Sequence, residues 1–365
     1  MTWRMFVLSL LLALVFRHVF IVMKSLGFHK TVYNHRPGEC TLVPGISNGS
    51  EDLELLSDGL VLISSGYPTL KNRVASSPRG HIYAFDLNDD DVKVKRLKIT
   101  GNYDPDDFRP HGISSFEDLD TGRTFVLIVN HLVNDGVIDV IEIFELHRQS
   151  MTLKFIRTVN DHLMKSINDV VAVSKDTFYF TNDGRSLSPG IRLIEQLLRF
   201  RTGGIFYCDV TSCDQVGEPL LEPNGIQLSR DQRYVIVSQP FEERIQIYER
   251  EDWRLKTNKP IQSIHVGTAP DNVFVDDEGD LWLGCHPVGF RTLLHMEDTK
   301  HIAPSQVIRI KFNQSDEPYQ SFDLEEIYSE DGLNISMSSS AVYYNNRLLV
   351  GTVRTGLLHC MVKAI

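Results

Sequence analysis

The chain has 365 residues, and 37 Lys and Arg against 48 Asp and Glu leave a net charge of −11. An acidic chain without a basic stripe lacks the positive surface that binds phosphates, so we expect no nucleic-acid partner. Its 42% hydrophobic and 9% aromatic residues exclude a disordered or fibrous protein.

The N-terminus is strongly apolar. Met5–Phe16 is an unbroken apolar run, and after Arg17 and His18 the run continues to Met23. The first run fits a secretory signal, whereas the whole stretch is long enough to cross a bilayer. No small-residue cleavage site follows, so we favour an uncleaved signal-anchor over residues 1–24 and a linker over 25–39. A cleaved signal peptide and a buried helix are the alternatives.

Both the anchor and the cleaved signal send the rest of the chain into the secretory pathway, either membrane-anchored with a lumenal or extracellular domain, or secreted. Disulfides are allowed there. Three sequons, at Asn48, Asn313 and Asn334, are candidate glycosylation sites.

From residue 40 onward, short apolar runs alternate with turn clusters. Six units each open on polar residues, and equivalent positions recur at Asp52, Gly112, Asp169, Gly225, Asn272 and Ser340. Six units of three or four strands predict an all-β fold, a six-bladed β-propeller over residues 40–365. Since the first strand of each blade lines the central channel, the opening polar residues should converge at one mouth.

The cysteines fit this plan. The last unit shows only three strands, so we expect the segment around Cys40 to supply the fourth and a Cys40–Cys360 disulfide to close the ring. Cys208 and Cys213 either pair across a hairpin or stay reduced. Cys285 is then the free thiol.

One helix is predicted within the repeat. Ser188 and Pro189 are typical of a helix start, and Ile191, Ile194, Leu197 and Leu198 form one apolar face. The helix either packs on the propeller or contacts lipid as a basic amphipathic helix.

The residues that converge at the channel mouth are mostly carboxylates and carboxamides: Glu51, Asp52, His111, Asn168, Asp169, Asn224, Asp271 and Asn272. Calcium prefers such oxygen donors, whereas zinc motifs are missing from the sequence. No Lys or Arg is expected to oppose this ring, so the carboxylates would repel one another without a cation. The pattern predicts a central calcium-binding channel; turn and cap roles are the alternative.

A calcium ion there would polarise a carbonyl, and hydrolysis would then need a base. His111 opens a blade and His131 ends the neighbouring strand, so we expect this pair to activate water. Gly45–Gly49 matches a serine-nucleophile pattern, but that motif needs a strand–turn–helix context, which argues against Ser47.

Several motifs together resemble the paraoxonase/arylesterase family, from about Cys40 to Cys360. They are Gly49-Ser-Glu-Asp-Leu-Glu, Pro110-His-Gly-Ile-Ser, Val129-Asn-His, Asn168-Asp-Val-Val-Ala, Thr181-Asn-Asp, Asn224-Gly-Ile and Leu281-Trp-Leu-Gly-Cys-His-Pro. The resemblance implies two calcium ions and hydrolysis of lactones and aryl esters. It assigns Glu51, Asn168, Asn224, Asp271 and Asn272 to a catalytic ion, and Asp52, Asp169 and the carbonyl of Ile113 to a structural one. His111 and His131 match the proposed catalytic pair, and His286 a pocket histidine.

The chain departs from the family pattern at the substrate wall. Gly184 stands where histidine is common, Glu222-Pro223 where small or aromatic residues are expected, and Arg291 on a usually apolar stretch; the loop after Gly66 is short. We favour a calcium-dependent arylesterase/lactonase. The alternative resembles non-enzymatic, membrane-anchored paraoxonase-like proteins that assist folding or surface expression of membrane-protein clients such as ion channels.

Overall fold

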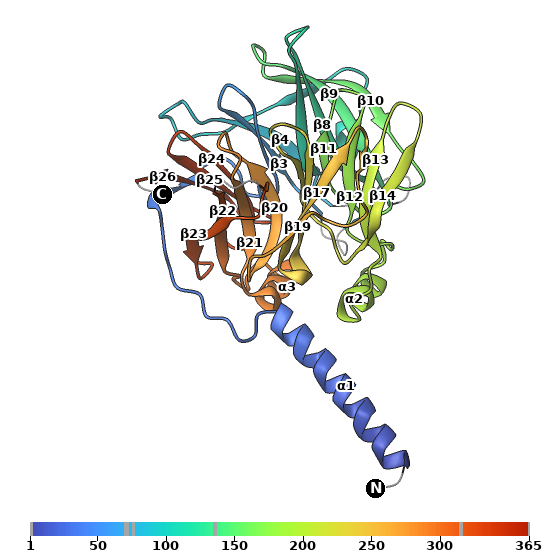
Figure 1. Cartoon of the computed structure of the whole chain (residues 1–365). Helices are drawn as coiled ribbons and strands as arrows, with labels where there is room; N and C mark the ends of the chain where they lie inside the picture. Colours follow the sequence, from blue (N-terminus) through green and yellow to red (C-terminus); the bar gives the residue numbers. More distant parts are fainter. Residues whose placement is uncertain (1–2, 69–72, 75–76, 134–136, 314–316, 364–365) are drawn as a thin grey trace.

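The computed structural model describes residues 3–68, 73–74, 77–133, 137–313 and 317–363. Over these ranges the strands form six sheets arranged around one axis (Figure 1), which confirms the predicted six-bladed β-propeller. Neighbouring strands within the sheets are antiparallel, except that β6 runs parallel to β10.

Each blade runs from an innermost strand outward. The first contains β2 (Leu53–Leu55), β3 (Leu60–Ser65), β4 (His81–Asp86) and β5 (Lys95–Arg96). The second contains β7 (Pro110–Asp118), β8 (Arg123–Leu132), β9 (Ile138–His147), β10 (Thr152–Val159) and β6 (Lys98–Thr100). The third contains β11 (Ile167–Ala172), β12 (Phe178–Asn182), β13 (Gly203–Cys208) and β14 (Cys213–Leu220).

The fourth blade contains β15 (Ile226–Leu228), β16 (Tyr234–Gln239) and β17 (Arg244–Glu251), with β18 (Arg254–Leu255) and β19 (Gln262–His265) both paired to β17. The fifth contains β20 (Ala269–Val275), β21 (Leu281–His286), β22 (Ser305–Phe312) and β23 (Phe322–Glu330). The sixth contains β24 (Ser338–Tyr344), β25 (Arg347–Thr352), β26 (Leu357–Val362) and β1 (Gly38–Val43).

The innermost strands form a closed circle in which β2, β7, β11, β15, β20 and β24 each contact the next and β24 contacts β2. Two glycines permit the close approach. A Cβ on Gly112 would lie 2.6 Å from Asp169 Cα, and a Cβ on Gly225 would lie 2.7 Å from Asn272 Cα. In the pairs His111-Gly112 and Asn224-Gly225, a predicted site residue is therefore followed by a glycine, because any larger side chain at the second position would clash with the neighbouring strand.

The hydrophobic core is divided among the blade interfaces. Leu62, Ile82 and Val126 belong to the cluster between the first and second blades, and five further clusters fill the other interfaces. The second strands are buried on both faces because each sheet is covered by a neighbour on either side. Radial packing of this kind hides the sheet faces that a single blade would expose.

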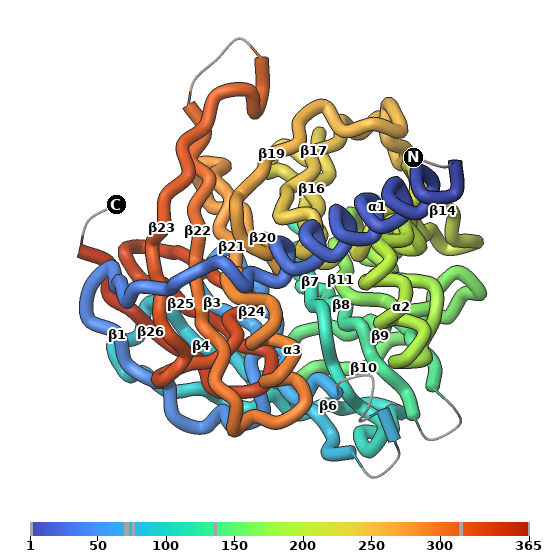
Figure 2. Tube along the Cα trace, turned by 90° about the horizontal axis from the view of Figure 1, so that it is seen from below, coloured from blue at the N-terminus to red at the C-terminus, as the bar shows by residue number. Residues whose placement is uncertain are grey.

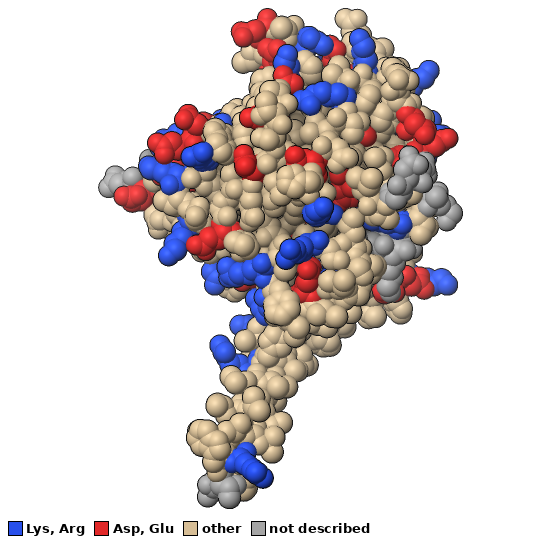
Figure 3. All heavy atoms as spheres, turned by 90° about the vertical axis from the view of Figure 1, so that its right-hand side faces the viewer, with Lys and Arg blue, Asp and Glu red and all other residues tan. Residues whose placement is uncertain are grey.

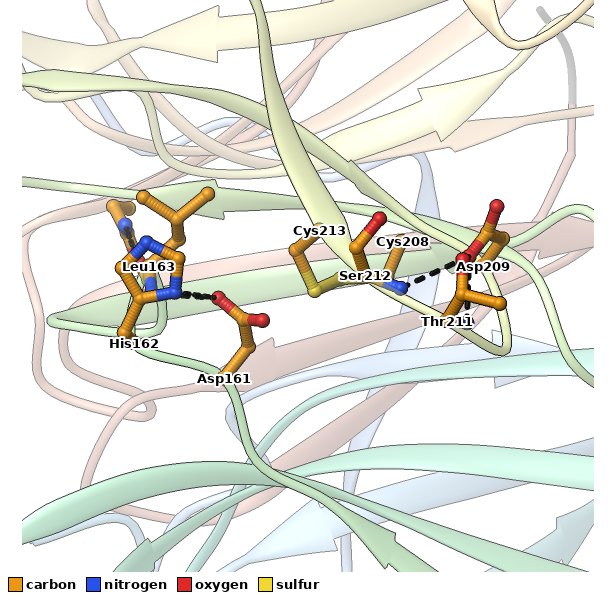
Figure 4. Close-up of a disulfide and its surroundings, with 9 residues drawn as sticks. Asp161, His162, Leu163, Cys208, Asp209, Thr211, Ser212 and Cys213 are labelled. Carbon is orange, nitrogen blue, oxygen red and sulfur yellow. Dashed lines mark hydrogen bonds and ion pairs between the residues drawn. A yellow bond between two sulfur atoms is a disulfide. The ribbon is translucent and has the colours of Figure 1, made fainter.

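The disulfides complete the ring. β1 pairs with β26, Cys40 lies opposite Cys360, and the two are bonded, as predicted. Cys208 and Cys213 are bonded across the β13–β14 hairpin (Figure 4), which settles the alternative left open by the sequence. Within this hairpin, Asp209 accepts hydrogen bonds from the amides of Thr211 and Ser212. Cys285 is free and buried.

Three helices gather at one end of the propeller. α1 (Trp3–Ser25) extends away from the blades in Figure 1 and crosses in front of them in Figure 2, where the molecule is seen from below. None of its residues is buried, and it is long and apolar enough to cross a membrane. Most of its surface is uncharged (Figure 3). α2 (Pro189–Leu197) and α3 (Gly289–Glu297) lie near its junction with the propeller. The described residues also form two short 3-10 helices, η2 (Pro105–Asp107) and η3 (Pro240–Glu242).

α2 begins at the predicted Ser188-Pro189 but is oriented with its apolar face outward. Ile191 and Ile194 are each about half exposed, whereas Arg192 and Glu195 are buried against the propeller. The helix therefore packs on the propeller, as one of the two alternatives expected, but the side in contact is the polar one that carries Arg192 and Glu195.

Candidate active site and metal centre

A cavity of about 430 Å³ lies at the end of the channel that carries the helices. Its floor comes from the starts of the innermost strands, and its rim from α1, α2 and α3. The predicted site residues that line it are Glu51, His111, Asn168, Asn224, Asp271 and His286. These six residues therefore share one cavity, whereas Asp52, Asp169 and Asn272, which were expected at the same mouth, are not among its lining residues.

Three oxygens of the predicted ligands in this cavity lack hydrogen-bond partners, and so does Glu222 Oε2 at its wall. Glu51 Oε2, Asn168 Oδ1 and Asn224 Oδ1 are inaccessible to solvent and accept no hydrogen bond from any described residue. The other carboxylate oxygen of Glu51 accepts a hydrogen bond from Asn272 Nδ2 at 3.1 Å. Leaving a buried acceptor unpaired costs about 1–3 kcal/mol, so three together point to a missing partner that accepts electron pairs.

Electrostatics point the same way. Burial, with Asp271 nearby, raises the pKa of Glu51 well above its usual range. Burial, with Asp52 nearby, does the same to the pKa of Asp169. Both groups would ionise readily only if a cation compensated the buried negative charge.

Asp52 and Asp169 also join neighbouring blades. Asp52 Oδ2 accepts a hydrogen bond from the amide of Ile113 at 2.9 Å, and Asp169 Oδ2 accepts one from the amide of Ile226 at 2.7 Å. Burial, with Glu51 nearby, raises the pKa of Asp52 to about 8. Both residues are buried, and neither is among the residues that line the cavity.

The donor set fits a hard cation. In the described ranges, no three His, Cys, Asp or Glu side chains are grouped to hold a metal by themselves. The orphaned oxygens of the predicted ligands belong instead to one carboxylate and two carboxamides, which are oxygen ligands suited to calcium. Glu51, Asn168, Asn224, Asp271 and Asn272 are the residues that would hold an ion in the cavity, and Asp52, Asp169 and Ile113 are those that would hold a second one.

The predicted histidine pair is formed. His111 Nδ1 lies 3.0 Å from His131 Nε2, and His111 Nε2 lies 3.5 Å from Glu51 Oε1. Burial and nearby Arg73 lower the pKa of both histidines to about 4, so both rings are neutral at pH 7. Tyr67 stacks on His111 with ring centroids 4.1 Å apart.

Two further residues lie behind the pair. Asp139 Oδ1 is 2.7 Å from His131 Nδ1, and Arg73 contacts both Asp139 and His131. Burial would raise the pKa of Asp139, but His131 and Arg73 hold it below its usual value. Arg73, which lies between β3 and β4, therefore adds a positive charge behind the histidine pair, where its guanidinium faces Asp139 and His131.

The substrate wall carries a buried ionic cluster. Arg192 of α2 forms ion pairs with Asp183 at 3.1 Å and Glu195 at 3.3 Å, and lies 4.0 Å from Glu222. A Cβ on Gly184 would lie 1.4 Å from an Arg192 guanidinium nitrogen. Two departures noted in the sequence, Gly184 and Glu222, thus belong to one structural feature, the burial of Arg192.

His286 also lies at the cavity, with Nε2 2.9 Å from Asp271 Oδ2. The candidate glycosylation residues Asn48, Asn313 and Asn334 are all exposed, and two residues of the second sequon lie outside the described residues.

Asp139, Arg73, Tyr67 and Arg192 were missed by sequence reasoning. Asp139 could have been found from the sequence, because a hairpin of the two strands β8 and β9 pairs it directly opposite His131. Arg73 and Tyr67 lie outside regular strands, where no periodicity predicts the direction of a side chain.

The fold and the buried oxygen donors beside a histidine pair define a propeller with a candidate hydrolytic metal centre. The sequence profile described as Arylesterase matches residues 32–362, and the chain belongs to that family. It is 36% identical to human serum paraoxonase/arylesterase 1 over 326 residues, 88% of each chain. It is 33% identical to mouse serum paraoxonase/lactonase 3, over 89% of each chain.

Solved structures agree on the fold. A gluconolactonase from Xanthomonas campestris aligns with a TM-score of 0.53 at 13% identity, covering 89% of this chain and 90% of that one. A luciferin-regenerating enzyme aligns with a TM-score of 0.53 at 12% identity, covering 88% and 94%.

Proposed function

We propose that this chain is a calcium-dependent hydrolase of lactones and aryl esters. The observation that carries the proposal is the trio of orphaned buried oxygens, on Glu51, Asn168 and Asn224, next to the His111–His131 pair. Relatives named arylesterase and lactonase support the substrate class.

The residues of the site have separate roles in the proposed hydrolysis. The cavity oxygens would hold one calcium ion, which when bound supplies positive charge that polarises the carbonyl of the substrate. His111 Nε2 faces Glu51 and is the ring nitrogen available to take a proton from water. His131 binds His111 Nδ1 and so fixes the orientation of that ring. Tyr67 covers the other face of His111 and limits its motion.

We propose further that α1 anchors the chain in a membrane of the secretory pathway, with the propeller on the lumenal or extracellular side. The two disulfides suit that compartment. Exposed Ile191, Ile194 and Leu197 on α2 and Leu294 on α3 give the same end of the molecule an apolar surface. The cavity would then open near the membrane.

Hydrolysis by the full-length chain in detergent micelles tests the function. We expect turnover of a panel of lactones and phenyl acetate in calcium, loss of turnover in chelator, and a fall of roughly 10²-fold or more in kcat for His111→Gln. His359→Gln is the matched control, because His359 is equally buried but packs near Phe85, away from the cavity. An equal loss in both variants would contradict a role for His111 in the chemistry.

A further inference from the structure

His131 has partners behind it that the proposed hydrolysis does not yet use. Asp139 lies opposite His131 in the β8–β9 pairing, and its Oδ1 is 2.7 Å from His131 Nδ1. Both side chains are fully buried, so water does not compete for this contact. An ionised carboxylate only accepts, which means that His131 Nδ1 must carry the hydrogen.

The hydrogen on His131 Nδ1 also determines which nitrogens donate and accept in the His131–His111 contact. A neutral imidazole has one N–H, so His131 Nε2 is left as the acceptor. It faces His111 Nδ1 at 3.0 Å, and His111 Nδ1 must therefore donate. The unprotonated nitrogen of His111 is then Nε2, the one that faces Glu51 and the cavity.

Asp139 is itself held in place by three donors. Besides His131, its Oδ1 accepts a hydrogen bond from Arg73 Nη1 at 2.8 Å, and its Oδ2 accepts one from the amide of Ile167 at 2.9 Å. Arg73 Nη2 also lies 3.3 Å from His131 Nε2. Because a guanidinium is always charged, it balances Asp139 and opposes a second proton on His131.

We propose that Asp139 is a positioning residue that fixes the tautomers of His131 and, through it, His111, with Arg73 as its counter-charge. The catalytic consequence rests on the proposed ester and lactone hydrolysis. A proton taken from water then stays on His111, because Arg73 disfavours its transfer to His131.

The tautomer can be measured without turnover. Full-length protein with 15N-labelled histidine, in detergent micelles, gives long-range 1H–15N correlations for each ring, and His131→Gln assigns the His131 signals. We expect the hydrogen of His131 on Nδ1 at pH 7. A hydrogen on Nε2 would overturn the proposal, whether or not the chain is an enzyme.

Kinetics of Asp139→Asn test the consequence. We expect kcat to fall roughly 10²-fold or more with KM changed less than about twofold, because the amide can donate to Nδ1 and move the hydrogen to Nε2. Asp280→Asn is the matched control: Asp280 is equally buried, pairs with Arg309 at 2.7 Å and accepts the amide of Phe312 at 2.8 Å, in another blade. Its kcat per folded molecule should not change.

The outcomes separate the two proposals. Unchanged kcat in Asp139→Asn, or an equal fall in Asp280→Asn, would overturn the positioning role while the proposed function stands. If the wild-type protein hydrolyses none of the substrates, the proposed function is contradicted. The position of the hydrogen on His131 in the wild-type protein then tests the role of Asp139 by itself. If Asp139→Asn does not fold, the 1H–15N spectrum of the wild-type histidines still tests the positioning role of Asp139.

Discussion

Single atoms carry most of the argument for a metal. Glu51 Oε2, Asn168 Oδ1 and Asn224 Oδ1 are buried acceptors without donors. The residue types and their recurrence at blade openings were readable in the sequence, because Asn and Asp cluster where each innermost strand begins. Their common lack of a donor was not readable, since it depends on the closed ring that brings the openings of three blades together.

At this scale we predict the effect of Asp169→Asn. The amide keeps the size of the side chain but only one acceptor oxygen, so one of the hydrogen bonds from the Ile226 and Val170 amides is lost and the free energy of unfolding in chelator should fall by about 1–3 kcal/mol. In calcium at about 100 times its Kd, wild type should gain about 2.7 kcal/mol, and the variant should gain much less. Thermal melts of both proteins in calcium and in chelator measure this difference.

Asp276→Asn is the control for that experiment. Asp276 is a buried carboxylate that accepts a hydrogen bond from Trp282 Nε1 at 2.7 Å, within the fifth blade and away from the cavity. It should retain the full calcium response. An identical calcium response in wild type and Asp169→Asn would remove Asp169 from the metal site.

At the scale of elements, the strands followed from sequence and the orientation of α2 did not. The repeat identified the blades, because alternation of apolar runs and turns is a local property. α2 carries a clear apolar face, but tertiary contacts turn its polar face inward around Arg192, Glu195 and Asp183. Gly184 makes the room for that guanidinium, which only the assembled structure reveals.

We predict that Arg192→Met loosens α2. Removing the guanidinium takes the counter-charge from buried Glu195 and from half-buried Asp183 and Glu222, and losing one partner of a buried pair typically costs about 3–5 kcal/mol. Hydrogen exchange should show lost protection in α2 while the blades keep theirs. Arg157→Met, which breaks a half-exposed pair with Asp176, should cost less than about 1 kcal/mol. Unchanged protection of α2 would show that Arg192 does not hold the helix.

At the scale of the whole molecule, two features matter: the contacts that close the propeller into a ring, and the position of α1 relative to the cavity. Closure through β1 and the Cys40–Cys360 disulfide was predictable, because the array lacked one strand at its end and had a cysteine at each end. The position of α1 beside the cavity was not. The amide of Phe290, on α3, donates to the carbonyl of Leu26 at 2.9 Å, and Lys30 pairs with Glu243, so contacts distant in sequence seat the helix.

We predict that Cys40→Ser combined with Cys360→Ser lowers the free energy of unfolding by about 2–5 kcal/mol, because it frees a loop spanning nearly the whole propeller. Replacing Cys208 and Cys213 frees only a short hairpin and should cost less. Guanidinium unfolding in calcium compares the two. A larger loss from the hairpin pair would contradict ring closure as the source of stability.

The most direct measurement is a calcium titration of chelated, full-length protein in micelles, with lactone hydrolysis and bound calcium recorded at every point. We predict that hydrolysis appears as calcium fills the cavity site and stays low in His111→Gln at the same occupancy. A folded, calcium-loaded protein that hydrolyses no lactone or aryl ester would contradict the account, and so would equal hydrolysis in chelator.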